Sequence, residues 1–269
     1  MKIFLSADME GTCGVTAWPE TERATPMDYT PIQKQMSREV AAACRGALAA
    51  GAEEILVKDA HDSARNIDPA ALPRKTRLSR GWSGDPLSMM SGLDREDFGA
   101  VFFTGCHAWA GCPGNPLSHT MNGQNDHVTL NGAPCSEFLL NAYTAGYYGV
   151  PVALVTGDEA LCRAARELIP SVTTVSVLSG RGGSTVSIHP DEAVERIEAA
   201  ASAAVAAAAQ CAVPMPAHFR MEIDFFKHHT AYSKSFYPGA TLERDKFVCF
   251  ETDDWYEMLR FCHFVLSDG

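Results

Sequence analysis

Short apolar runs alternate with longer stretches that carry apolar residues on one face. The first run predicts a strand over Lys2–Asp8, the next stretch an amphipathic helix over Asp28–Ala50 that ends at Gly51, and the following run a strand over Glu54–Asp59. A short apolar run is typical of a buried strand, whereas apolar positions three and four apart are typical of a helix. The chain therefore begins with a βαβ pattern.

The same alternation continues almost to the end of the chain. Further strands are predicted over Ala100–Gly105, Val128–Leu130, Pro151–Thr156, Val172–Val177, Phe219–Asp224 and Phe247–Glu251, and further helices over Pro134–Tyr148, Asp158–Leu168, Pro190–Gln210 and Asp254–Leu266. Strands that take turns with helices predict an α/β fold, here a layered α/β/α sandwich with a mostly parallel or mixed sheet. The glycine-rich segment 180–183 lacks the Lys-Ser/Thr ending of a phosphate-binding loop, and we interpret it as a flexible connection.

Composition narrows the range of partners. The chain has 269 residues, 46% of them hydrophobic, which is enough for one large core or two smaller lobes. Its formal net charge of −11 argues against nucleic acid and membrane as partners, because surfaces that bind phosphate or anionic lipid concentrate lysine and arginine.

The compartment is predicted from cysteine usage and from the first residues. Nine cysteines, an odd number without a CxxC pair, fit a reducing environment. The opening MKIFLSADMEG is acidic too early for a signal peptide, and no run reaches the ~20 apolar residues of a membrane helix. We therefore expect a cytoplasmic protein.

Acidic and imidazole side chains follow three of the predicted strands. Asp8 and Glu10 stand two positions apart at the end of the first strand and so point to the same side, while His61 and His107 follow the second strand and the strand over Ala100–Gly105. Ligands of α/β proteins bind beyond the carboxyl ends of the strands. Each histidine alone could be an ordinary loop residue, but together these side chains form a mixed N/O set that suits zinc and tolerates manganese or cobalt.

Two further residues are candidates for the same site. His119, in PLSHTMNG, is framed by Ser118 and Thr120, which can orient an imidazole, and it is a candidate general base. Glu137 lies in the first turn of a predicted helix, where it either complements the helix dipole or reaches into the site.

Five separated motifs resemble one known family in order and spacing. The runs SADMEG, KDAHDS, GCHAWA, LSHTM and SEFLLNAYTAGYYGVPVALVTGD are similar to the zinc D-aminopeptidases encoded with dipeptide-transport systems, the DppA family. The resemblance extends from Met1 to about Ile169 and continues more weakly toward the carboxyl end.

The resemblance implies a site and a chemistry. Carried over position by position, the family's metal ligands are Asp8, Glu10, His61, His107 and Glu137. The family binds two Zn²⁺ ions per subunit, with the aspartate at Asp8 between them, and its catalytic histidine corresponds to His119. The implied activity is a binuclear zinc aminopeptidase that hydrolyses short peptides with N-terminal D-residues, of the D-Ala-D-Ala type, by metal-activated water. The family also implies a homo-oligomer, a homodecamer.

Other functions stay open at this point. The alternatives are an L-specific aminopeptidase, another two-metal amidohydrolase, and a catalytically silent peptide-binding or metal-binding partner of a transport system.

The segment Val213-Pro214-Met215-Pro216 is a candidate boundary. We expect a single α/β catalytic unit over 1–269, with a metal-bearing lobe 1–212 and a small C-terminal lobe 213–269 as its subdivision.

Overall fold

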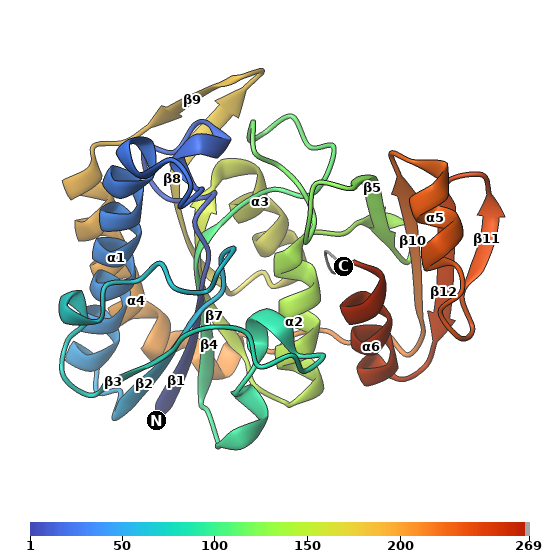
Figure 1. The fold of residues 1–269 in the computed structure, drawn as a ribbon. Coiled ribbons are helices and arrows are strands. Elements are labelled where there is room, and N and C mark those ends of the chain that lie inside the picture. Colours follow the sequence, from blue (N-terminus) through green and yellow to red (C-terminus); the bar gives the residue numbers. More distant parts are fainter. Residues whose placement is uncertain (267–269) are drawn as a thin grey trace.

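A computed structural model describes residues 1–266. Its strands form two β-sheets (Figure 1). The larger sheet has the strand order β3-β2-β1-β4-β7-β8-β9, and all its pairs are parallel except β8 with β9. The strands are β1 (Lys2–Ala7), β2 (Glu54–Asp59), β3 (Thr76–Ser79), β4 (Ala100–Cys106), β7 (Val152–Asp158), β8 (Thr173–Arg181) and β9 (Ser184–Ser187). The mostly parallel sheet that the alternating pattern predicts is confirmed.

Helices cover both faces of this sheet (Figure 1). One face carries α1 (Pro26–Ala49) and α4 (Pro190–Ala207), and the other carries α2 (Glu137–Tyr147) and α3 (Glu159–Leu168). The two helices of the first face pack closely because Gly46 has no side chain: a Cβ there would lie 2.0 Å from the Glu198 carbonyl oxygen. The central strands are covered on both sides, and Ile3, Phe4 and Leu5 of β1 are fully buried.

A second, antiparallel sheet lies beside α2 (Figure 1). Its order is β11-β12-β10-β5-β6, from β5 (Asn125–Leu130), β6 (Ala133–Pro134), β10 (Phe219–Phe225), β11 (Thr241–Arg244) and β12 (Phe247–Thr252), with α5 (His228–Lys234) and α6 (Trp255–Val265) packed on it. This sheet joins segments from before and after the 213–216 connector. The division into lobes 1–212 and 213–269 stays a prediction.

Several local elements differ from the sequence-based expectation. The strands β3, β9 and β11 and the helix α5 were not expected, and segment 180–183 forms the end of the β8–β9 hairpin instead of a flexible connection. Helix α2 begins at Glu137 and not at Pro134, because Pro134 pairs with Thr129 in the second sheet and Ser136 caps the helix by accepting a hydrogen bond from the Leu139 N–H.

The nine cysteines are buried free thiols. No helix within residues 1–266 combines the length and the apolar character needed to cross a bilayer.

Candidate metal centre

The carboxyl ends of three adjacent parallel strands bring the first candidate residues together. In the register of the sheet, Ala7 of β1 pairs with Asp59 of β2 and with Thr104 of β4. The segments that leave these strands carry Asp8 and Glu10, His61, and His107. Because β1 lies between β2 and β4, the side chains that follow the three strands share one edge of the sheet.

Glycines allow the strand ends to approach each other. The Gly11 N–H donates to the Gly105 carbonyl at 2.8 Å, and a Cβ on Gly105 would lie 2.1 Å from the Asp8 carbonyl oxygen. Gly105 also has a φ of +67°, a left-handed conformation that disfavours other residues. The segment that follows β4 therefore approaches the backbone of the Asp8 segment closely.

The three histidines are held in the same way. The carbonyls of Thr21, Ala108 and Leu117 accept hydrogen bonds from His61 Nε2 at 2.8 Å, His107 Nδ1 at 2.8 Å and His119 Nδ1 at 2.9 Å, respectively. A carbonyl can only accept, so these nitrogens carry the hydrogen, and the neutral ring presents a lone pair on its other nitrogen. A backbone carbonyl that orients a histidine in this way is typical of metal ligands.

The free histidine nitrogens face carboxylates. His61 Nδ1 lies 3.0 Å from Glu10 Oε2 and 3.4 Å from Asp8 Oδ1. His107 Nε2 lies 3.5 Å from Asp8 Oδ2 and 3.6 Å from Glu137 Oε2. The two oxygens of Asp8 therefore face different histidines.

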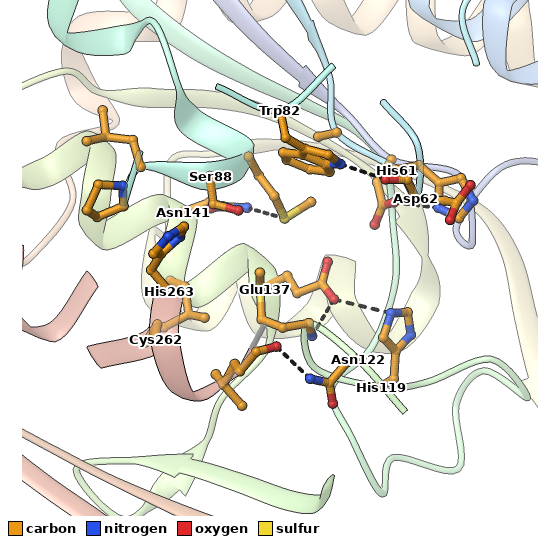
Figure 2. A pocket seen from close by; sticks show the side chains of 18 of the residues that line it. His61, Asp62, Trp82, Ser88, His119, Asn122, Glu137, Asn141, Cys262 and His263 are labelled. Atoms are coloured by element: carbon orange, nitrogen blue, oxygen red, sulfur yellow. Dashed lines mark hydrogen bonds and ion pairs between the residues drawn. The ribbon is translucent and has the colours of Figure 1, made fainter. Parts of the chain in front are cut away.

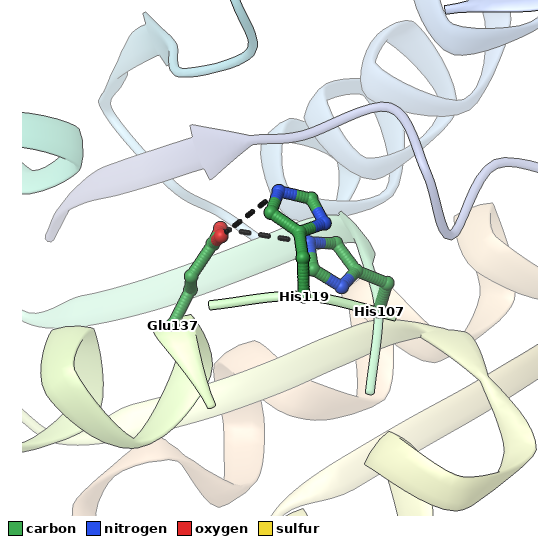
Figure 3. Close-up of side chains that lie close together, drawn as sticks. All are labelled: His107, His119 and Glu137. Carbon is green, nitrogen blue, oxygen red and sulfur yellow. Dashed lines mark ion pairs between the residues drawn. The ribbon is translucent and has the colours of Figure 1, made fainter. Parts of the chain in front are cut away.

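Glu137 and His119 complete the cluster (Figure 3). His119 Nε2 lies 3.3 Å from Glu137 Oε1, which also accepts a hydrogen bond from the Met121 N–H at 2.7 Å. Of the two roles open to Glu137, the structure therefore shows the one in which its side chain reaches into the site. All six candidate residues from the sequence converge here.

Electrostatics favours a cation at this cluster. Burial raises the pKa of Asp8 to about 7, and the neighbouring Glu10 adds to the effect. Burial opposes charge on His61 and His107 as well, but the carboxylates of Glu10 and Glu137 outweigh it and hold the pKa of both imidazoles well above the ordinary value. The field that favours protons on these rings would also favour a divalent cation.

The donor atoms fit a metal. Two groups, Asp8 with Glu10 and His107, and His107 with His119 and Glu137, each offer three ligand atoms within 4.8 Å of one another. Among the described residues, His107 Nε2 and Glu10 Oε2 are buried atoms without a hydrogen-bond partner. Mixed imidazole and carboxylate ligands are those that zinc accepts.

His119 is the most accessible of the three imidazoles. Its side chain is 14% exposed, against 7% for His61 and 1% for His107. One face of the ring stacks on His107 with centroids 4.3 Å apart, and the Trp18 ring lies 5.3 Å away at a tilt. His119 therefore has a fixed ring orientation together with some access to solvent.

The buried carboxylate of Asp158 supports the loops of the site. The sequence predicts this residue only as the start of a helix. Asp158 caps α3 by accepting from the Leu161 N–H at 2.8 Å, and it also accepts from the Ala108 N–H at 2.6 Å and Asn115 Nδ2 at 3.1 Å. The Asn115 amide in turn donates to the Glu10 carbonyl at 3.0 Å. Asp158 is the last residue of β7 and lies at the same edge of the sheet as the other strand ends, and this position could have indicated its role in supporting the loops.

A cavity of about 580 Å³ opens beside the cluster (Figure 2). It is lined by Asp8, Glu10, His61, His119 and Glu137, by the loop from Trp82 to Met89, and by residues of α2 and α6. The second sheet therefore contributes a wall of the site through α6. Sequence reasoning missed that wall because nothing local in the chain links α6 to the strand ends.

Imidazoles and carboxylates that converge beside a cavity, at the strand ends of an α/β sheet, are typical of metal-dependent hydrolases. The chain belongs to one family of that class, the D-aminopeptidases of peptidase family M55, whose family model matches residues 1–264. The family expected from the five motifs is confirmed.

Two comparisons with proteins of Bacillus subtilis agree with this assignment. A D-aminopeptidase of strain 168 is 38% identical over 179 residues, which cover 66% of this chain and 63% of that protein. The solved structure of the Zn-dependent D-aminopeptidase DppA, described as a self-compartmentalizing protease, matches with a TM-score of 0.89 and 29% identity over 100% of this chain and 99% of that one.

Proposed function

We propose that this chain is a binuclear zinc aminopeptidase that releases the first residue of short peptides with an N-terminal D-residue, of the D-Ala-D-Ala type. The observation that carries the proposal is that the carboxylates of Asp8, Glu10 and Glu137 face the free nitrogens of two histidines: His61 Nδ1 lies near Glu10 and Asp8, and His107 Nε2 lies near Asp8 and Glu137. Membership of the D-aminopeptidase family and the likeness to a Zn-dependent relative support it. We further propose a homo-oligomer, a decamer by analogy with the family, in the cytoplasm.

Asp8, Glu10, His61, His107 and Glu137 would hold two zinc ions. Asp8 presents one carboxylate oxygen to His61 and the other to His107, so it would contribute to holding both ions. When bound, zinc supplies Lewis acidity, which brings the pKa of water near 7 and polarises a carbonyl group.

His119 would act as the proton-transfer group. The Leu117 carbonyl keeps the hydrogen on Nδ1, so Nε2 is the nitrogen that can take up or deliver a proton at the cavity. Packing against His107 and Trp18 holds the His119 ring in one orientation. The same Nε2 could stabilise negative charge on a reacting carbonyl oxygen, since a protonated imidazole is a strong donor.

The test combines zinc content with paired substrates. Chelator-stripped protein should bind two zinc ions per chain and release amino acid from D-Ala-D-Ala but not from L-Ala-L-Ala. L-only cleavage would keep the chemistry and overturn the stereochemistry. No cleavage of either peptide with two zinc ions bound would favour another amidohydrolase or a silent binding protein.

His119→Ala separates the catalytic role from a ligand role. We expect the variant to bind two zinc ions and to lose activity by about 10²–10⁴-fold, the usual contribution of a general acid or base. His189→Ala is the matched control, because His189 is exposed at the start of α4. If His119→Ala lost one zinc ion instead, His119 would be a ligand.

A further inference from the structure

We infer that Asn141 and His263 form a subsite that binds the free carboxylate of the peptide's second residue, which makes short peptides with a free carboxyl end the preferred substrates. This inference rests on the proposed aminopeptidase function and adds a specificity-determining pair to it. Both residues line the cavity, and in Figure 2 they lie on the opposite side of Glu137 from His61 and His119.

The first step of the argument is the position of Asn141. It follows Glu137 by four residues on α2, so the two side chains lie on the same face of the helix, about one turn or ~6 Å apart along the axis. Glu137 belongs to the metal cluster, and one peptide residue spans at most about 3.5 Å. Asn141 is therefore placed to meet the group one residue beyond a scissile bond held at the cluster.

The second step is the state of the Asn141 amide. The side chain belongs to a residue that is only 7% exposed, and its Nδ2 donates to the Met89 sulfur at 3.3 Å. A thioether is a weak acceptor, so this buried donor is poorly satisfied. A carboxylate oxygen would be a much better partner, since hydrogen bonds to charged groups are about twice as strong as neutral ones.

The third step concerns the other side chains around the cavity. No lysine or arginine lines the cavity within the described part of the chain. Several polar lining groups already donate elsewhere: Trp82 Nε1 to the Asp62 carbonyl, Asn122 Nδ2 to the Leu266 carbonyl, and Ser83 Oγ to Asp85.

His263 is the donor that remains on α6. The residue is half-buried, its ring contacts Phe264 at 4.9 Å, and its ring nitrogens have no hydrogen-bond or ion-pair partner within residues 1–266. An imidazole N–H and a primary amide that line the same cavity can both donate to one carboxylate. Because α6 belongs to the layer of the second sheet, this subsite also explains why that layer approaches the cluster.

The experiment compares D-Ala-D-Ala with D-Ala-D-Ala-amide, using the zinc-loaded full chain. The two peptides share the scissile bond and differ in the terminal charge. We expect the free acid to have a kcat/KM about 10- to 100-fold higher, expressed mainly in KM because the contact is made equally in the ground and transition states.

Variants assign the effect to the two residues. Asn141→Leu and His263→Leu should each lower kcat/KM for the free acid by about 10-fold or more and change that for the amide by less than about 3-fold, and Asn141→Asp should discriminate against the acid further. Ser184→Ala, at an exposed hydroxyl of β9 that donates to the Arg181 carbonyl away from the cavity, is the control and should leave both substrates unchanged. Zinc content and thermal unfolding check that each variant folds, and the His263 variant keeps the test open if an Asn141 variant does not fold.

Equal cleavage of acid and amide by the wild-type protein would overturn the subsite and leave the aminopeptidase proposal standing. An equal loss on both substrates in the variants would show that the two residues act on the structure of the cavity and would also overturn it. Failure to cleave either peptide with two zinc ions bound would overturn the proposed function itself, and the subsite with it.

Discussion

Asp158 offers a quantitative test of how the protein holds its metal-binding loops. Asp158→Ala removes the acceptor of three N–H groups, those of Leu161, Ala108 and Asn115. Loss of the helix cap costs about 1 kcal/mol. The other two donors lie on buried residues, and each buried donor left unpaired costs about 1–3 kcal/mol. Together these terms predict that the free energy of unfolding falls by about 3–7 kcal/mol, a large share of the 5–15 kcal/mol typical of a domain.

The same substitution should weaken zinc binding. Asp158 accepts from the Ala108 N–H, which adjoins His107, and from Asn115, which donates to the Glu10 carbonyl. The substitution therefore removes a hydrogen-bond acceptor from the segments that carry His107 and Glu10. Supporting groups behind metal ligands typically contribute 10- to 100-fold to affinity. We expect a zinc affinity about 10- to 100-fold lower in competition with a chromogenic chelator.

Asp254→Ala is the matched control for the cap. Asp254 caps α6 through the Tyr256 N–H but is exposed and holds no loop of the site. It should lose about 1 kcal/mol by urea denaturation and bind zinc as the wild-type protein does. If Asp158→Ala lost no more stability than this control and kept full zinc affinity, the reasoning about the shared anchor would be refuted.

Two further predictions concern the segments around the cluster. Burial raises the pKa of Glu39 to about 7, whereas the unfolded chain loses this proton near pH 4.5. The protonated group therefore contributes stability at low pH, and that contribution is lost as the pH rises from 4.5 to about 7. In chelator, Glu39→Gln should therefore gain stability relative to the wild-type protein by up to about 3 kcal/mol between pH 5 and pH 8, and a pH-independent difference would contradict the assignment. Gly105→Ala should lower both stability and zinc content, because Gly105 has a positive φ and the new Cβ would meet the Asp8 carbonyl. Gly51→Ala is the control: Gly51 also has a positive φ but open space around it, so this variant should lose stability and keep its zinc content. Normal zinc content in Gly105→Ala by elemental analysis would argue against the close approach.

Local patterns determined much of the fold and four of the six residues of the site. Continuous apolar runs predict strands that are buried on both faces, and residues that directly follow parallel strands must share an edge if the strands are neighbours. For this reason Asp8, Glu10, His61 and His107 were predicted together from spacing, before any resemblance was considered. The resemblance then connected His119 and Glu137 to them, which spacing alone left open.

Other features were decided only by the tertiary structure. The segment 180–183 forms a hairpin because β9 pairs with β8, and the short strand β3 pairs with β2. No local pattern in the sequence specifies either pairing. Likewise, α6 reaches the cavity, although it follows the strand of Asp8 by more than two hundred residues. The sequence by itself determined which residue types stand at the strand ends, since periodicity is local. Only the tertiary structure decided strand order, the role of Asp158 and the cavity wall, since these depend on contacts between segments that are distant in the chain.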